Sequence, residues 1–190
     1  MIPFAWASIG AIAGILIKAA RDRSVTKLVG TLGGPENATK QRLFGPMEFL
    51  PDPQPKNPEA IKITNDWEKD NIVSVRIPQL NKTVEFHRKG ADRLVQLFAA
   101  WESAGLMPLV MSYDGTWVPR FIRGSKTMLS NHAFGTAIDL NARWNPLGKP
   151  GAPAGETGST QLLGPVAESL GWRWGGRFSR LDPMHFELVS

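Results

Sequence analysis

The sequence has no cysteine, only three histidines and no internal repeat among its 190 residues. Without cysteine the chain can form neither disulfide bonds nor thiolate metal sites, which leaves histidine and carboxylate side chains as the good ligands for a metal. The chain also has no long run of lysine or arginine and no nucleic-acid-binding motif. We therefore expect no nucleic-acid partner.

The composition is that of a globular protein with a mildly basic surface. Hydrophobic residues make up 42% and charged residues 21% of the chain, and the formal net charge is +5. A chain of this length has room for one packed domain plus an accessory segment. The positive charge favours an acidic partner, such as an anionic membrane or the bacterial cell wall.

The N-terminal segment is apolar: residues 1–17 carry no charge and are rich in alanine, isoleucine and glycine. The segment is short for a membrane-spanning helix, which needs about 20 apolar residues, and it lacks the basic start of a secretory signal peptide. We predict an apolar helix over residues 1–23. Its first 20 residues would contact a membrane or a protein complex, or else pack on the chain's own globular domain.

The following segment, residues 24–60, is rich in glycine and proline. Proline fixes the backbone and removes amide donors, so we predict an extended linker or a strap over a surface here.

From residue 61 the pattern changes to alternating helices and short strands. We predict strands over 71–77, 82–87, 109–113, 136–140 and 184–189, and helices over 90–104 and 162–170. The dipeptide Asp114-Gly115 is a turn signal that would close the third strand. This mixture predicts an α+β fold, in which residues 61–190 form one compact catalytic domain with a small antiparallel sheet flanked by helices.

Two segments combine histidine with acidic side chains in apolar, strand-like sequence. The first runs from Ser130 to Asp139, and the second from Asp182 to Glu187. A catalytic zinc ion keeps three protein ligands and one position for water. His132, Asp139 and His185 supply these ligands, so we predict one Zn²⁺ per chain. The third histidine, His87, is predicted to lie at the surface or at a helix entry rather than on the metal.

The water bound at such a site also needs a base. Asp182 lies three residues before His185, and its carboxylate is placed to accept the water proton and pass it to the leaving amine. Glu187 is the competitor, because it shares a strand face with His185. Glu187 also suits the role of holding the other ring nitrogen of His185. We favour Asp182 as the base.

The pattern Ser-x-His-x-x-Gly-x-Ala-x-Asp, followed by Asp-x-x-His, resembles the zinc D-alanyl-D-alanine carboxypeptidase family. This family includes the L-alanyl-D-glutamate endopeptidases of bacteriophage lysins. The similarity runs from about residue 71 to 187 and includes Trp144-Asn145-Pro146-Leu147-Gly148 and Trp174-Gly175-Gly176. The resemblance implies that His132, Asp139 and His185 bind zinc and that Asp182 is the catalytic carboxylate.

The family also uses an arginine upstream of the first ligand to grip the substrate and stabilise the oxyanion. Arg120 and Arg123 are the candidates, and the spacing of Arg120 to Gly124 and Ser130 fits the family pattern better. Ser130 is expected to orient the site through a hydrogen bond.

The sequence thus predicts a zinc metallopeptidase that hydrolyses a bond in the peptide stem of peptidoglycan. An aspartate at the base position is typical of the L-Ala-D-Glu endopeptidase branch, and the D-Ala-D-Ala carboxypeptidase activity is the alternative. A hypothesis of another class is a non-catalytic, wall-binding or structural adaptor in a phage or membrane complex. We expect the protein to act in the cell wall or periplasm, either anchored to a membrane or as part of a phage particle.

Overall fold

The computed structural model describes residues 34–188. The predicted helix over residues 1–23 lies outside the described residues. The helices are α2 (Gly34–Phe44), α3 (Trp67–Asn71), α4 (Ala91–Ser103) and α5 (Leu163–Ser169), and the strands are β1 (Phe49–Pro51), β2 (Ile61–Ile63), β3 (Ile72–Ile77), β4 (Lys82–His87), β5 (Tyr113–Gly115), β6 (Ala137–Leu140), β7 (Trp172–Trp174) and β8 (His185–Leu188). This mixture of helices and small antiparallel sheets confirms the predicted α+β class.

A four-stranded antiparallel sheet, in the order β5-β6-β8-β7, carries the site. Its register places Ile138 opposite Phe186 and Phe186 opposite Trp174, and all three side chains are buried on one face. Because successive side chains of a strand point to opposite faces, Asp139 and His185 lie together on the other face. The pleat therefore separates the hydrophobic core from the polar site.

Helix α4 covers the core face of this sheet. Its buried residues Leu94, Leu97, Phe98 and Trp101 recur at helical spacing and belong to the same core cluster as the sheet. The rings of Trp101 and Phe186 pack edge to face with centroids 5.4 Å apart. Burial of this apolar stripe fixes α4, and the β3–β4 hairpin that packs beside it, behind the sheet.

A second core cluster lies below the first, and the N-terminal part of the described chain builds it. Phe44 at the end of α2 and Phe49 in β1 are buried there with Phe134. Within the stretch predicted as a linker or strap, residues 34–60 form α2 and β1 and pack on the fold. The apolar contacts of Phe44, Met47 and Phe49 act together with polar contacts of α2, and such a mixture has no clear hydrophobic pattern in the sequence.

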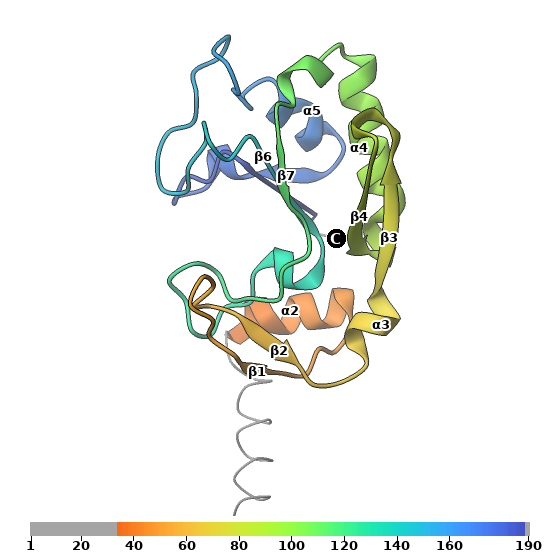
Figure 1. Cartoon of the computed structure of the whole chain (residues 1–190), viewed down its shortest axis with the longest axis vertical. Helices are drawn as coiled ribbons and strands as arrows, with labels where there is room; N and C mark the ends of the chain where they lie inside the picture. Colours follow the sequence, from red (N-terminus) through yellow and green to blue (C-terminus); the bar gives the residue numbers. More distant parts are fainter. Residues whose placement is uncertain (1–33, 189–190) are drawn as a thin grey trace, which may run out of the picture.

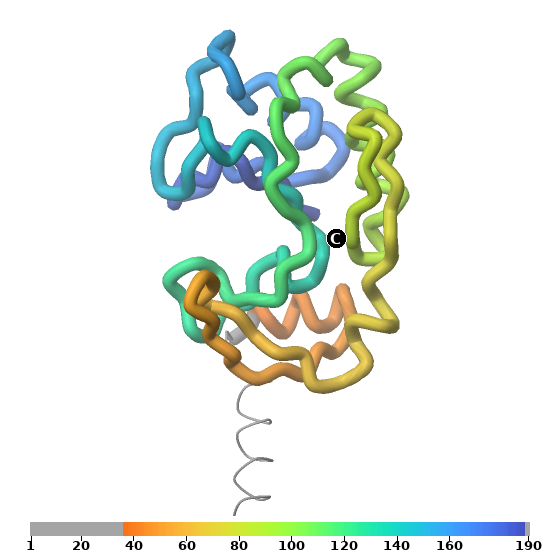
Figure 2. Tube along the Cα trace, in the orientation of Figure 1, coloured from red at the N-terminus to blue at the C-terminus, as the bar shows by residue number. Residues whose placement is uncertain are grey.

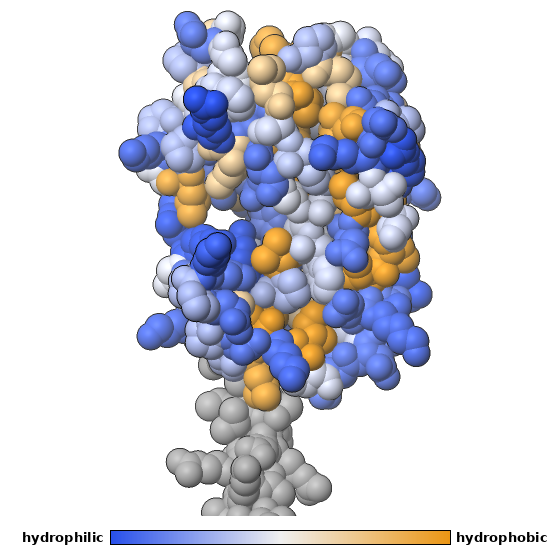
Figure 3. Space-filling model, viewed as in Figure 1, coloured by the Kyte–Doolittle hydropathy of each residue, from blue (hydrophilic) through white to orange (hydrophobic). Residues whose placement is uncertain are grey.

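Figures 1 and 2 show the arrangement of these two parts. Helix α2 and strands β1 and β2, in orange and yellow, form the lower part, and the sheet and α5 form the upper part. The green and teal segment 117–134 runs alongside the lower strands, where Phe121 donates its amide hydrogen to the carbonyl of Glu59 at 2.9 Å. Figure 3 shows the surface hollowed between the two parts, with hydrophilic residues around the opening.

One predicted strand is misplaced. The stretch 109–113 was expected to be extended and to turn at Asp114-Gly115, whereas β5 begins only at Tyr113 and includes the dipeptide. The amides of Met111 and Ser112 donate to the side-chain oxygen of Asn141 at 2.8 and 3.0 Å. A side chain thus takes the hydrogen bonds that a strand partner would otherwise receive.

His87 is buried, which corrects the surface alternative predicted for it. Its Nδ1 accepts the amide of Lys89 at the start of a 3₁₀ turn, and its Nε2 lies 3.0 Å from the carbonyl oxygen of Phe44. The histidine therefore ties α2 to the β3–β4 hairpin at a helix entry. Across residues 34–188, no helix has the length and apolar character needed to cross a membrane.

Candidate active site

A short 3₁₀ turn, Asn131–Phe134, presents His132 to the site. The turn begins at Ser130, whose hydroxyl accepts the amide hydrogen of His132 at 3.2 Å, as a helix-capping serine does. It ends at Gly135, which has a φ of +63° and packs so closely that an added Cβ would lie 2.8 Å from Ile72. Ser130 thus caps the turn that carries His132.

Strands β6 and β8 place the other two side chains. Asp139 pairs with His185 in the antiparallel register, so the two side chains lie next to each other on the same face of the sheet. His132 and His185 are buried, and Asp139 is partly buried. The structure thus brings together the three side chains that the sequence predicts as ligands, although the first comes from a loop and the others from the sheet.

The three donor atoms form a nearly equilateral triangle. His132 Nε2 lies 3.1 Å from His185 Nδ1 and 3.1 Å from Asp139 Oδ1, and His185 Nδ1 lies 3.0 Å from Asp139 Oδ1. Donor atoms around tetrahedral zinc, with bonds of about 2.0–2.1 Å, are separated by about 3.3 Å. The residues present therefore fit a zinc ion in both donor type and spacing.

The outer ring nitrogens strengthen this conclusion. His132 Nδ1 lies 2.5 Å from the carbonyl oxygen of Thr116, and His185 Nε2 lies 3.0 Å from Glu187 Oε2. A carbonyl and a carboxylate only accept hydrogen bonds, so both outer nitrogens must donate. In the neutral imidazoles the two inner nitrogens then present lone pairs to each other and to Asp139. Such a set of acceptors calls for a cation between them.

The charges of the site agree with this picture. Burial alone would lower the pKa of His185, but its contacts with Asp139 and Glu187 raise that pKa to about 10. Burial would raise the pKa of Asp139, and the two histidines hold it far below its usual range. The two carboxylates thus stabilise positive charge at the triangle, and a metal cation competes with protons for the same position.

Glu187 fixes the orientation of His185. The same oxygen, Oε2, also accepts a hydrogen bond from the side-chain amide of Asn131, and Arg173 lies 3.3 Å from Oε1. The contact between Glu187 and His185 is the one considered for Glu187 from the sequence. Asn131 and the carbonyl of Thr116 were not anticipated, although Asn131 stands next to His132 in the motif and its amide is a natural partner for a carboxylate.

Asp182 lies in the turn that leads into β8. Its carbonyl oxygen accepts the amide hydrogen of His185 at 2.9 Å, and a Cβ on Gly175 would overlap that same carbonyl. Among the described residues, the buried Oδ1 of Asp182 has no hydrogen-bond partner. Burial raises the pKa of Asp182 to about 6, against the lowering effect of nearby His185, Arg120 and Arg180. An unpaired carboxylate oxygen with a raised pKa is a candidate proton acceptor.

The structure distinguishes the two arginine candidates. Arg123 donates to Glu59 at 2.7 Å and to Asn57 at 2.8 Å, so its charge is already paired. Arg120 is partly buried, donates to the carbonyl of Phe121 at 3.1 Å, and lies in the field of Asp139 and Asp182. Arg120 therefore retains its charge for a ligand beside the metal triangle.

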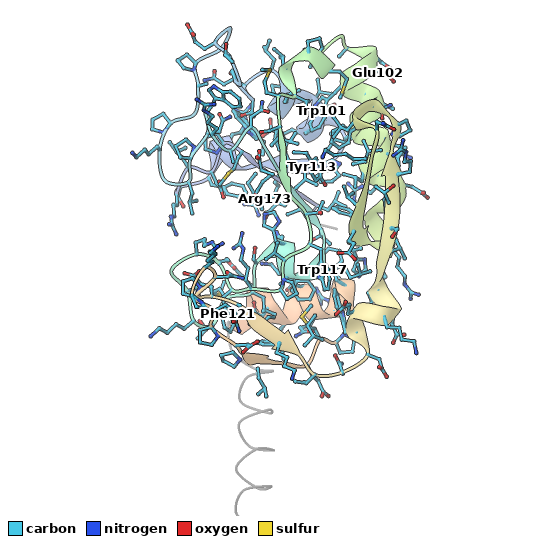
Figure 4. The ribbon with its side chains drawn as sticks, in the orientation of Figure 1. Trp101, Glu102, Tyr113, Trp117, Phe121 and Arg173 are labelled. Atoms are coloured by element: carbon cyan, nitrogen blue, oxygen red, sulfur yellow. The ribbon has the colours of Figure 1, made fainter. Side chains whose placement is uncertain are left out.

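These residues line a cleft with a volume of about 1110 Å³ between the two parts of the molecule. Its walls carry six basic side chains, Lys40, Arg120, Arg123, Arg173, Arg177 and Arg180, and four acidic ones, Glu36, Asp139, Asp182 and Glu187. Figure 4 shows Arg173 on the upper side of the opening and Phe121 in the lower part. Lys40 was not anticipated as a cleft residue, because it stands in the stretch predicted as a linker.

The comparisons with known proteins agree with this site. The family model described as D-alanyl-D-alanine carboxypeptidase matches residues 123–188, about a third of the chain. No curated protein and no solved structure matches the chain. The matched range contains the three metal-site residues as well as Asp182 and Glu187, whereas Arg120 and α2 lie outside it. The part of the chain that carries the site is thus similar to the D-alanyl-D-alanine carboxypeptidase family, which supports a peptidase.

Proposed function

We propose that this protein is a zinc-dependent peptidase that hydrolyses a peptide bond in the stem of peptidoglycan. The carrying observation is the triangle of His132, Asp139 and His185, in which one ring nitrogen of each histidine and one carboxylate oxygen face one another, while the outer ring nitrogens donate to Thr116 and Glu187. The similarity of residues 123–188 to a peptidase family supports the same reaction class.

In this proposal His132 Nε2, Asp139 Oδ1 and His185 Nδ1 hold the metal, which when bound supplies a Lewis acid and makes water acidic near neutral pH. Asp182 accepts a proton from the attacking water on its unpaired oxygen and then protonates the leaving amine. Glu187 holds the ring of His185 in place throughout, because its carboxylate receives the Nε2 proton.

Arg120, which lines the same cleft, completes the set. Its guanidinium is held by a backbone carbonyl rather than by a carboxylate. The charge is therefore available to stabilise negative charge that develops on the carbonyl oxygen of the scissile bond. Arg123, which is paired with Glu59, shapes the wall through that ion pair.

We further propose an L-Ala-D-Glu type of endopeptidase activity, supported by the aspartate at the base position. Hydrolysis of D-Ala-D-Ala is the alternative, supported by the description of the matching family. Either activity would place the protein in the cell wall or periplasm. Contact with a membrane or a protein complex through residues 1–20 concerns a segment outside the described residues.

The test is digestion of purified peptidoglycan and defined muropeptides by the full chain, with the products identified by mass spectrometry. We expect new peptide termini from one stem bond, loss of activity with EDTA, and recovery on addition of zinc. Absence of hydrolysis by zinc-loaded, folded protein would refute the proposal. The position of the new termini distinguishes the two candidate bonds.

A matched set of histidine variants tests the metal site in the same preparation. His132→Ala and His185→Ala should lose bound zinc, measured by mass spectrometry of the metal. His87→Asn, which alters the third histidine, should keep one zinc per folded chain, because His87 bonds to Phe44 in the second core. Loss of zinc from His87→Asn alone would contradict the assignment.

A further inference from the structure

Six basic side chains line the cleft, and they fall into two groups by their partners. Arg123, Arg173 and Arg177 are each paired with a glutamate, at 2.7, 3.3 and 2.7 Å respectively. The other three are Lys40, Arg120 and Arg180. Each of them donates to a backbone carbonyl, and none forms an ion pair in the part of the chain that the structure describes.

A carbonyl oxygen can hold a cation in place without cancelling its charge. Lys40 Nζ donates to the carbonyl of Leu129 at 2.8 Å, which uses one of its three hydrogens. Arg180 donates to the carbonyl of Arg123 at 2.7 Å. These cations are therefore positioned but not neutralised, which suits the binding of an anionic ligand.

The three unneutralised cations lie in different parts of the cleft. Arg180 donates to the carbonyl of Arg123 and Arg120 donates to that of Phe121, so both are held at the segment between β5 and β6. Lys40 comes from α2 and is held at the carbonyl of Leu129, two residues before Asn131, whose side chain bonds to Glu187. Lys40 thus enters the cleft from a different element than the two arginines.

The position of Lys40 in the cleft wall carries a cost in solvation free energy. Burial lowers its pKa, because a charged ammonium loses solvation in the cleft wall. A partly buried cation with only one carbonyl partner gains more from an added carboxylate than an exposed lysine does. Helix α2 itself is held to the segment that carries Ser130, since Asn37 Nδ2 donates to the carbonyl of Thr127 at 2.8 Å.

We propose that Lys40 is a specificity-determining residue that binds a free carboxylate of the peptide substrate from the wall of the cleft that α2 forms. The inference rests on the proposed peptidase function and adds a substrate class to it. The preferred substrate is a peptide with a free carboxylate away from the scissile bond. Helix α2, which lies outside the range matched by the family, supplies this contact.

The test uses stem peptides in matched pairs that differ in one group. In one pair the α-carboxylate of D-glutamate is free or is a carboxamide, and in the other the C-terminal carboxylate is free or is a carboxamide. For the native chain we expect a lower KM for the acid form of at least one pair. Lys40→Met should raise the KM for that acid form on the order of 10-fold, with little change in kcat and a much smaller effect on the amide.

Two variants separate binding from structure. Lys40→Arg keeps the charge and should restore most of the preference for the acid form. Lys62→Met removes a lysine from the exposed face of β2 and should leave the preference unchanged. A purely structural role for Lys40 would instead lower the activity on acid and amide alike and would lower the melting temperature.

Binding measured without turnover keeps the two proposals distinguishable. Calorimetry of Asp182→Asn protein with the same peptides should show weaker binding of the acid form when Lys40→Met is added. If the native chain hydrolyses neither form of any pair, the proposed function fails. If the native chain hydrolyses acid and amide forms with equal KM, the proposed role of Lys40 is overturned. The same holds if Lys40→Met lowers the activity on the acid and amide forms equally.

Discussion

Removing the negative charge of Glu187 should weaken zinc binding while leaving the shape of the site intact. Glu187→Gln is nearly isosteric, and its amide oxygen can still accept the Nε2 hydrogen of His185, which Glu187 Oε2 meets at 3.0 Å. The variant loses only the charge that makes the His185 ring a better metal ligand. The outer partner of His132 is a neutral carbonyl, so among the described metal-site residues Glu187 supplies the only negative charge at an outer ring nitrogen.

The expected magnitude follows from the burial of this carboxylate. Glu187 is only 7% exposed, so water screens its charge weakly. Replacement of such an outer partner lowers metal affinity by about 10- to 100-fold, equivalent to about 1.4–2.7 kcal/mol. The amide nitrogen of the variant would take the place of Oε1 beside Arg173, which places the change toward the larger value.

The assay is competition for zinc with a chelator of known affinity, followed for native and variant chains at fixed pH. Glu168→Gln is the matched control, because it removes a carboxylate that pairs with exposed Arg177 away from the metal triangle. The control should keep the native zinc affinity. An unchanged affinity in Glu187→Gln, with the fold intact by circular dichroism, would refute the reasoning about the outer partner.

Three further predictions concern the base and its turn. Asp182→Asn should reduce kcat by about 10²- to 10⁴-fold while keeping one zinc per chain, as measured by a peptidase assay and metal analysis. A variant with near-native kcat would exclude Asp182 as the base. The base acts when deprotonated, so kcat/KM should rise with pH through a midpoint near the Asp182 pKa of about 6. Arg180→Met removes a cation that lowers this pKa, so the variant should move the midpoint to higher pH. A shift of the midpoint to lower pH would contradict the assignment. Gly175→Ala should destabilise the chain by about 1–3 kcal/mol, because the added Cβ would overlap the carbonyl of Asp182. Gly115→Ala is the control and should change the melting temperature little, because no atom lies near its added Cβ. Equal melting temperatures of the two variants in calorimetry would contradict the account of this turn.

The residues of the site could be named from the sequence because the chemistry is concentrated in two short segments. His132 and Asp139 come from one loop-and-strand unit, and Asp182 and His185 from the turn into the last strand. Histidines are rare in this chain, so two of them beside acids in apolar sequence are informative. The class of each ligand follows from the residue type alone.

The positions of the supporting residues could not be obtained in this way. The pairing of Asp139 with His185 depends on strand register, and the carbonyl of Thr116 reaches His132 from β5's trailing end. Neither contact has a local sequence signal. Long-range contacts of this kind arise only when the sheet and the loop pack together.

Helix α2 was missed for a different physical reason. Its sequence, GPENATKQRLF, is largely polar and has no amphipathic stripe that would mark a helix packed on a core. Specific contacts hold it instead, such as the Oδ1 of Asn37 accepting the amide hydrogen of Leu129 at 2.9 Å and the ammonium of Lys40 on the carbonyl of the same residue. Polar anchoring of this type is invisible to hydrophobic periodicity, and it brings Lys40 into the cleft.

The most direct test of the metal site is a crystal structure of the zinc-loaded chain, with anomalous diffraction measured on both sides of the zinc absorption edge. The account predicts one anomalous peak bonded to His132 Nε2, Asp139 Oδ1 and His185 Nδ1, with Glu187 still on His185 Nε2. A folded chain without zinc at this triangle, or with zinc bound through His185 Nε2, would contradict it.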